Sequence, residues 1–305
     1  MATGAPSLRK LGLGTVQFGL AYGVTNPRGQ VPSAEAQTIL AAALAAGIDL
    51  LDTAAAYGNS EAVLGHALGA RPELRIVSKL PPLAADRIGA AEIDQCRTTV
   101  LRSLTLLRRE SIYGLLLHRP DDLRKPGADQ LVALLEELKR AGKVAKVGIS
   151  AYDRAQVDQT LERFTPDLVQ VPVNLLDQRL LQDGTLDRLK GRNVEVHARS
   201  AFLQGALLAE PASLPSHFVP HRDRLRAVGS VAERAGLSRL ALCLRFVLAQ
   251  PAIDRVIVGV TALAELHQIL GVAVDDAPLP AGLAALAVDD PRLVNPALWP
   301  PAAHT

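Results

Sequence analysis

Four residues of chemically active types lie where short apolar runs end in the first part of the chain. They are Asp52, Lys79 and His118, with Tyr57 on the loop that follows Asp52. A nearby ammonium stabilises a phenolate and lowers the phenol pKa from its usual value of about 10. A histidine in the same place can hydrogen-bond a substrate oxygen. The four groups together are suited to proton exchange with a carbonyl oxygen.

Each of these residues also has a simpler interpretation. Asp52 could cap a turn, Tyr57 could be half-buried packing, Lys79 could be solvated, and His118 could bond only to backbone. Their shared position after successive strands favours the chemical interpretation. Since no side chain donates hydride, reduction of a carbonyl also implies a nicotinamide cofactor.

Short β-rich runs alternate with helical patterns along most of the chain, which is typical of parallel βα units. The expected strands are Leu11–Thr15, Ile48–Asp52, Arg75–Lys79, Tyr113–His118, Ala145–Ser150, Leu168–Pro172, Val194–Ala198 and Val256–Gly259. The expected helices are Ala34–Ala46, Ser60–Leu68, Ala90–Leu107, Ala128–Ala141, Arg154–Arg163, Thr185–Lys190, Arg222–Ala249 and Leu263–Leu270.

Eight βα units in about 250 residues match a single (β/α)₈ TIM barrel. We therefore expect one domain over residues 1–305, with a Pro-rich tail from about residue 277. A doubly wound Rossmann sheet is the alternative. It requires a Gly-x-Gly-x-x-Gly turn after the first strand, and the stretch Leu11–Gln17 lacks both the third glycine and a helix start.

Composition limits the partners of the protein. The chain of 305 residues is 49% hydrophobic with a formal net charge of +2, so bulk charge attracts neither nucleic acid nor an anionic membrane. Residues 1–10 hold no apolar signal segment. The two cysteines have no metal-binding or disulfide spacing, which fits a reducing compartment, and we expect a cytoplasmic protein without a metal. The sequence does not indicate an oligomeric state.

Several motifs occur in order over nearly the whole chain. They are Gly47-Ile48-Asp49-Leu50-Leu51-Asp52-Thr53 with Tyr57-Gly58 and Glu61, Ser78-Lys79, Leu117-His118-Arg119-Pro120, Gly142-Lys143-Val144 with Val147-Gly148-Ile149-Ser150, and Gln170-Val171-Pro172-Val173-Asn174. With these motifs the sequence resembles the aldo-keto reductase family. The resemblance implies a (β/α)₈ barrel in which Tyr57 is the general acid and Asp52, Lys79 and His118 complete a catalytic tetrad.

The resemblance also implies a nicotinamide site at the ends of the strands. Ser150 and Gln170 would hold the carboxamide, and the loops after the seventh and eighth strands would hold the diphosphate and adenosine ends. The cofactor-binding residues expected on this basis are Thr15, Val16, Ser150, Gln170, Arg199, Ser200, Phe202, Gln204, Gly205, Gly259, Thr261 and Glu265.

Two residues depart from the family pattern near the expected nicotinamide. Ala151 replaces a common asparagine, so one amide contact to the carboxamide is lost. Arg199 stands where an aromatic residue often stacks on the ring. A guanidinium can stack in the same way and would place a positive charge beside the ring, favouring the reduced, neutral form. A contact with the diphosphate or with an acidic substrate is the alternative for Arg199.

The loop after the eighth strand bears on the choice between NAD(H) and NADP(H). It contains no basic residue, and Glu265 stands where an arginine would meet a 2′-phosphate. A carboxylate repels that phosphate and accepts hydrogen bonds from a free ribose hydroxyl, which places NAD(H) ahead of NADP(H). The alternative is that Glu265 faces solvent and a base such as Arg255 binds the phosphate.

The substrate is less constrained than the cofactor. Tyr22, Arg119 and Trp299 are the candidate substrate-binding residues, together with Phe202. Aromatic residues make up only 3% of the chain, so a sugar-like or hydroxylated carbonyl compound is expected rather than a steroid. The expected function is oxidoreduction between a carbonyl and an alcohol. The alternative is a cofactor-binding regulatory or partner-binding barrel with negligible turnover.

Overall fold

Eight parallel strands close into a barrel in the computed structural model, which describes residues 6–69, 71, 73–275 and 277–300. The strands are hydrogen-bonded in chain order, and β8 returns to pair with β1. They are β1 (Leu11–Gly14), β2 (Leu50–Asp52), β3 (Arg75–Leu80), β4 (Ile112–Leu117), β5 (Val144–Ser150), β6 (Leu168–Pro172), β7 (Glu195–Arg199) and β8 (Arg255–Gly259). The expected (β/α)₈ barrel is confirmed, and the Rossmann alternative is excluded because the sheet is closed.

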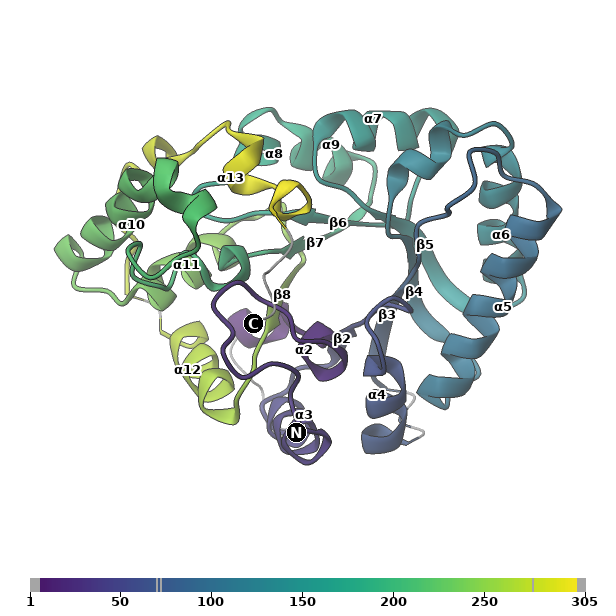
Figure 1. The fold of residues 1–305 in the computed structure, drawn as a ribbon, viewed down its shortest axis with the longest axis horizontal. Coiled ribbons are helices and arrows are strands. Elements are labelled where there is room, and N and C mark those ends of the chain that lie inside the picture. Colours follow the sequence, from purple (N-terminus) through teal and green to yellow (C-terminus); the bar gives the residue numbers. More distant parts are fainter. Residues whose placement is uncertain (1–5, 70, 72, 276, 301–305) are drawn as a thin grey trace.

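The longer helices surround the strands as an outer ring (Figure 1). The helices of the protein are α1 (Pro6–Lys10), α2 (Val16–Gly19), α3 (Ser33–Ala45), α4 (Ser60–Leu68), α5 (Ala90–Leu107), α6 (Ala128–Arg140), α7 (Arg154–Arg163), α8 (Arg179–Gln182), α9 (Thr185–Gly191), α10 (Arg222–Arg234), α11 (Arg239–Leu248), α12 (Leu263–Ala273) and α13 (Pro291–Val294). The 3₁₀ segments are η1 (Pro120–Arg124), η2 (Leu203–Gly205), η3 (Ser216–His221), η4 (Leu283–Leu286) and η5 (Pro296–Leu298). Within the described ranges, no helix is long and apolar enough to cross a membrane.

One expected helix was wrong. The stretch Arg222–Ala249 forms two helices, α10 and α11, because the chain turns between them. Gly236 adopts a left-handed conformation with φ of 65°, which ends the first helix. The Ser238 side chain then accepts a hydrogen bond from the Ala241 N–H at 3.0 Å and caps the second.

An apolar layer fills the middle of the barrel. Its members, from five different strands, are Leu50, Val77, Leu116, Leu168 and Ile257. Side chains two residues apart on a strand point to the same face. The next inward position toward the carboxyl ends of β2, β3, β4 and β6 therefore belongs to Asp52, Lys79, His118 and Gln170. The sequence thus places a polar layer directly above an apolar one.

The tail after α12 crosses back over the barrel. Val288 donates its N–H to the Leu176 carbonyl at 2.8 Å, and the Gln178 side chain donates to the Leu283 carbonyl at 2.9 Å. These bonds hold residues 277–300 close to the mouth. The last expected tail residues, 301–305, lie outside the described residues, as do residues 1–5.

Candidate active site

The deepest polar group at the mouth is an ion pair between Lys79 and Asp52. Lys79 Nζ lies 2.7 Å from Asp52 Oδ2 and also donates to the Thr53 carbonyl at 2.9 Å. The Gln170 amide donates to the other Asp52 oxygen at 2.7 Å. Only 1% of the Lys79 side chain is exposed, and burial lowers the pKa of its ammonium. The pair is a fixed polar platform under the cavity.

Tyr57 is placed over this platform by a tight turn between β2 and α4. The backbones of Gly19 and Gly58 touch here, since a Cβ on Gly19 would lie 1.8 Å from the Tyr57 carbonyl oxygen. A Cβ on Gly58 would lie 2.3 Å from the Gly19 oxygen, and Gly58 has a φ of 55°. Both positions therefore require glycine.

Buried hydroxyl groups fix the same turn to the strands. Ser60, at the start of α4, donates to the Thr15 carbonyl at 2.8 Å and receives a hydrogen bond from Thr53 at 3.1 Å. Thr15 Oγ1 in turn donates to the Asp52 carbonyl at 2.9 Å. The loop that carries Asp52 and Tyr57 is thereby tied to β1, which limits movement of the phenol.

Tyr57 contacts both Lys79 and His118. The Lys79 Nζ lies 5.0 Å from the centroid of the Tyr57 ring, and the His118 ring meets that ring edge-on with centroids 5.8 Å apart. The structure therefore brings together all four residues of the expected tetrad. It does so at the carboxyl ends of the strands, which is the face where TIM barrels carry their active sites.

The expected direction of the Tyr57 pKa was wrong. Burial raises this pKa, the Asp52 carboxylate raises it further, and the Arg199 charge opposes them. The nearby Lys79 ammonium is itself paired with Asp52. Tyr57 is therefore protonated at neutral pH.

His118 is held neutral. Burial lowers its pKa to about 4, and the charges of Lys79 and Arg199 act in the same direction. Nδ1 is buried without a hydrogen-bond partner within the described part of the chain. A neutral imidazole can donate one hydrogen bond to a substrate oxygen without competing with Tyr57 as an acid.

A cavity of about 990 Å³ opens above these groups. Its lining includes residues at the ends of β1, β5, β6, β7 and β8 and in the loop after β1. Among its lining residues are the following expected cofactor or substrate residues: Thr15, Val16, Tyr22, Ser150, Gln170, Arg199, Ser200, Phe202, Gln204, Gly205, Gly259, Thr261 and Glu265.

Two expected substrate residues do not line the cavity. Arg119 is engaged by Asp122 at 2.8 Å and by the Leu83 carbonyl. Trp299 donates its indole N–H to the Arg292 carbonyl at 3.1 Å. Its ring packs against Phe218, with the two ring centroids 4.9 Å apart. Both side chains are occupied by local contacts, so these two expectations are corrected. Pro296 and Ala297 of the tail line the cavity instead.

The loop after β7 has an unusual backbone. Ser200, Leu203, Gln204 and Gly205 all have positive φ, from 49° to 91°. The Leu203 N–H donates to the Ser200 carbonyl and the Gly205 N–H to the Phe202 carbonyl, each at 2.9 Å. The loop is therefore held in a compact turn by its own backbone hydrogen bonds.

The far end of the cavity is formed by the loop after β8. Both carboxylate oxygens of Glu265 accept hydrogen bonds from Thr261, from its N–H at 2.6 Å and its hydroxyl at 3.0 Å. Arg28, from the loop after β1, donates to the Thr261 carbonyl at 2.5 Å. Its guanidinium is also paired with Glu35 at 2.7 Å.

Sequence reasoning missed several lining residues. Among them are Arg28, Tyr152, Arg239 and Gln268. Arg28 lies in a turn-rich stretch directly after the first strand, so its position and its charge were the available signal. Tyr152 follows Ser150 by two residues, and nothing in the local pattern distinguishes it.

Comparison with known proteins places this geometry in context. The model of the "Aldo/keto reductase family" matches residues 10–280. The chain is 30% identical over 268 residues to a 6-dehydroglucose reductase of Novosphingobium aromaticivorans, covering 81% of this chain and 84% of that protein.

Two solved structures share the fold. An aldo-keto reductase of Bacillus halodurans, in its holo form, has a TM-score of 0.72 at 23% identity, covering 91% of this chain and 90% of that one. A glycerol dehydrogenase of Gluconobacter oxydans has a TM-score of 0.70 at 26% identity, covering 86% of each chain.

Proposed function

This chain belongs to the aldo/keto reductase family, and from that premise we propose that it is a nicotinamide-dependent oxidoreductase with Tyr57 as its general acid and base. It interconverts an aldehyde or ketone and the corresponding alcohol. The observation that carries the proposal is the buried Lys79–Asp52 pair beneath Tyr57, beside a neutral His118, at the floor of a cavity of about 990 Å³.

Each protein group has a separate task in the reaction. His118 donates a hydrogen bond to the substrate carbonyl oxygen and holds it near the Tyr57 hydroxyl. Tyr57 gives that oxygen its proton, and in the reverse direction takes the proton back. Lys79 and Asp52 keep the phenol in place and compensate the charge that develops there. The nicotinamide, when bound, supplies or accepts the hydride.

The cavity offers groups for each part of the cofactor. Ser150 and Gln170 would hold the carboxamide; since the Gln170 nitrogen already donates to Asp52, its oxygen is free to accept. The loop Ser200–Gly205, which lines the cavity, would hold the diphosphate. Thr261 and Gln268 would meet the adenosine end.

We propose that the cofactor is NAD(H) rather than NADP(H). Glu265 lines the far end of the cavity, where its carboxylate is fixed by Thr261. Arg28 contacts this loop through the Thr261 carbonyl, but its charge is compensated by Glu35. A 2′-phosphate would therefore meet a negative group and no uncompensated positive one. Glu265→Arg should raise NADPH affinity relative to NADH by about tenfold, and an unchanged ratio in calorimetry would refute this assignment.

The proposed substrate is a small hydroxylated carbonyl compound such as a sugar aldehyde. Tyr22 and Tyr152 line the cavity, and their hydroxyl groups can bond substrate hydroxyls. Two of the similar proteins, the 6-dehydroglucose reductase and the glycerol dehydrogenase, are named for polyhydroxylated substrates. The buried thiols of Cys96 and Cys243 are compatible with the proposed cytoplasmic location.

The experiment that tests the function is calorimetric titration with NADH and with NADPH, followed by a screen of hydroxylated aldehydes for cofactor oxidation. Binding of at least one cofactor, with substrate-dependent oxidation, is the expected result. Binding without turnover on any carbonyl compound would favour the regulatory alternative. Failure to bind either cofactor would refute the proposal.

A further inference from the structure

Arg199, at the end of β7, is held in an unusual environment for a charged side chain. Its guanidinium carbon lies 4.1 Å from the centroid of the Tyr152 ring, so one planar face is covered by an aromatic group. Its terminal nitrogens donate to the Ala151 carbonyl at 3.2 Å and to the Ser200 hydroxyl at 3.4 Å. Its Nε is buried without a partner in the described part of the chain. None of these contacts carries a negative charge.

The other cations of the site are compensated. Lys79 pairs with Asp52 at 2.7 Å, Arg28 with Glu35 at 2.7 Å, and Arg239 with Glu210 at 3.0 Å. An uncompensated, half-buried charge is costly to maintain, so its presence at the mouth calls for a functional explanation. The field of Arg199 also reaches the reacting groups, because it lowers the pKa of Tyr57 against the raising effect of burial and lowers that of His118.

The orientation of the guanidinium decides what kind of group it can meet. Carboxylates and phosphates bind in the plane of a guanidinium, along its N–H edge. Two of its five N–H groups are donated to Ala151 and Ser200, and Nε is buried. The guanidinium also has a second planar face, opposite Tyr152, and Arg199 lines the cavity. A planar guanidinium face is suited to stacking on a flat ring.

A bound nicotinamide would have to lie beside the reacting groups, because a hydride donor must approach the carbonyl carbon to about 3–3.5 Å while the carbonyl oxygen is bonded to Tyr57. The Arg199 charge acts on both Tyr57 and His118. A ring placed next to these two residues would therefore lie within the field of Arg199.

We propose that Arg199 selects the redox state of the cofactor: its uncompensated charge admits the neutral reduced nicotinamide and disfavours the oxidised cation. The inference rests on the proposed oxidoreductase function and adds a direction to it. With oxidised cofactor bound, two positive charges face each other in a partly desolvated site. The enzyme is therefore built to bind reduced cofactor, reduce the carbonyl compound and release the oxidised product readily.

The test is a set of dissociation constants measured by calorimetry for the reduced and oxidised forms of the preferred cofactor. For the unmodified protein, the oxidised form should bind more weakly than the reduced form. Arg199→Gln keeps a planar polar group but removes the charge, and should lower the ratio of the oxidised to the reduced Kd by about tenfold or more. A tenfold change in this ratio shifts the potential of the bound two-electron couple by about 30 mV.

Two further variants separate charge from position. Arg199→Lys keeps the charge without the plane, so the ratio should stay close to that of the unmodified protein even if both forms bind more weakly. Arg239→Gln is the matched control, because it removes another cavity arginine whose charge Glu210 already compensates. It should affect the two redox forms equally. Circular dichroism of each variant shows whether the barrel has folded.

The outcomes distinguish this inference from the proposed function. If both redox forms bind but Arg199→Gln weakens them by the same factor, the guanidinium serves the diphosphate and the inference is wrong. If Arg199→Gln alters only the KM for acidic carbonyl compounds, Arg199 binds substrate and the inference is again wrong. If no cofactor form binds to the unmodified protein, the proposed function itself fails.

Discussion

Charged side chains are paired at the amino-terminal end of the barrel, whereas one at the carboxyl end has no anionic partner, although the same strands build both ends. Strand β7 shows this most directly, since Glu195, His197 and Arg199 occupy alternate positions along it. Glu195 at the amino-terminal end accepts hydrogen bonds from three side chains, while Arg199 at the carboxyl end has no anionic contact. His197 between them is fully buried and bonds to Glu195 at 2.7 Å.

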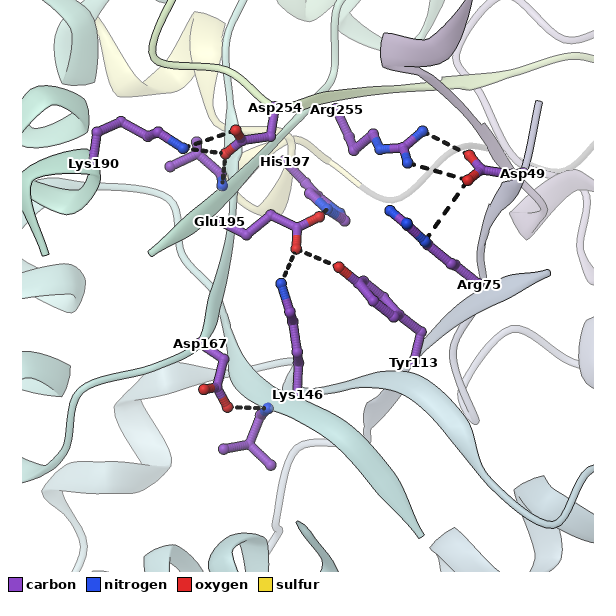
Figure 2. Close-up of polar contacts among 12 residues, drawn as sticks. Asp49, Arg75, Tyr113, Lys146, Asp167, Lys190, Glu195, His197, Asp254 and Arg255 are labelled. Carbon is purple, nitrogen blue, oxygen red and sulfur yellow. Dashed lines mark hydrogen bonds and ion pairs between the residues drawn. The ribbon is translucent and has the colours of Figure 1, made fainter. Parts of the chain in front are cut away.

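Figure 2 shows how completely the amino-terminal end is paired. Glu195 is bonded by the Tyr113 hydroxyl at 2.5 Å and by Lys146. Asp254 accepts from Lys190 at 2.7 Å and from the Val196 N–H at 2.8 Å. Two further carboxylates are paired in the same way. Asp167 accepts hydrogen bonds from Lys139 and from the Val147 N–H, and Asp49 pairs with Arg255 and Arg75.

The two ends of the strands therefore have different roles, one in stability and the other at the cavity. Paired charges and bonded N–H groups at the amino-terminal end stabilise the closed barrel without exposing reactive groups. At the mouth, the protein tolerates a buried phenol and a guanidinium without an anionic contact. Local rules of stability are commonly broken at functional sites and satisfied elsewhere. The following predictions test that contrast.

The largest effect is expected at the mouth from removal of one hydroxyl group. Tyr57→Phe keeps the ring against Lys79 and His118 but removes the acid, so kcat for carbonyl reduction should fall by about a thousandfold. Cofactor affinity, measured by calorimetry, should stay within about twofold because the hydroxyl faces the substrate. Turnover at the level of the unmodified protein would show that another group is the acid.

Next in size is a change that displaces Tyr57 without touching its side chain. Gly19→Ala would set a Cβ 1.8 Å from the Tyr57 carbonyl oxygen and 2.7 Å from the Ser60 nitrogen. The turn must then move, and a shift of about 1 Å at a reacting group can cost a hundredfold in kcat.

The matched control for that change lies toward the other end of the barrel. Gly191 ends α9, shortly before β7, and a Cβ there would meet nothing within 4 Å. Gly191→Ala should leave kcat unchanged. If both alanine variants retain full activity, close packing of the turn does not position Tyr57.

A smaller effect is expected from the amino-terminal end, and on stability instead of turnover. Glu195→Gln keeps the shape but leaves Lys146 without its carboxylate, and should lower the free energy of unfolding by about 2 kcal/mol. Urea denaturation measures this change. The kcat/KM should stay within about twofold. Glu137→Gln is the control, because its pair with Arg97 is exposed and its loss should change stability little.

The stabilisation by Glu195 should also depend on pH. Burial alone would raise its pKa, but hydrogen bonds from His197, Lys146 and Tyr113 outweigh burial and hold the pKa well below the usual 4.5. A carboxyl group with a lowered pKa stabilises the fold above its unfolded pKa and loses this effect as the pH falls. The stability difference between the unmodified protein and Glu195→Gln should therefore begin to shrink as the pH falls below about 4.5, and continue to shrink toward the lowered pKa. A constant difference down to pH 3 would contradict the assignment.

The smallest effect is expected in the pH profile of the reaction itself. Since burial lowers the His118 pKa from 6.5 to about 4, the imidazole stays neutral from pH 5 to 8. The kcat/KM for reduction should vary by less than about twofold across this range. An inflection near pH 6.5 that disappears in His118→Gln would show that His118 titrates normally. Between pH 6.5 and 4 the unfolded chain binds a proton that the folded chain does not, so this group makes stability fall as the pH is lowered.

The sequence by itself determined the barrel and the position of its reacting groups. Each strand was recognisable as a short apolar run, and its observed ends differ from the expected ones by no more than two residues. Because side chains alternate along a strand, Asp52, Lys79 and His118 had to share the inward layer above the apolar one. Parallel strands in chain order then brought these residues to the same end of the barrel.

Only the tertiary structure decided which partners the long side chains and the loops contact. Trp299 packs against Phe218, Arg119 pairs with Asp122, and Arg28 donates a hydrogen bond to the Thr261 carbonyl across the cavity. The raised pKa of Tyr57 depends on its burial and on the neighbouring Asp52 carboxylate. These outcomes depend on flexible side chains and loops choosing among partners distant in the chain, and a local repeat of two or 3.6 residues contains no information about that choice.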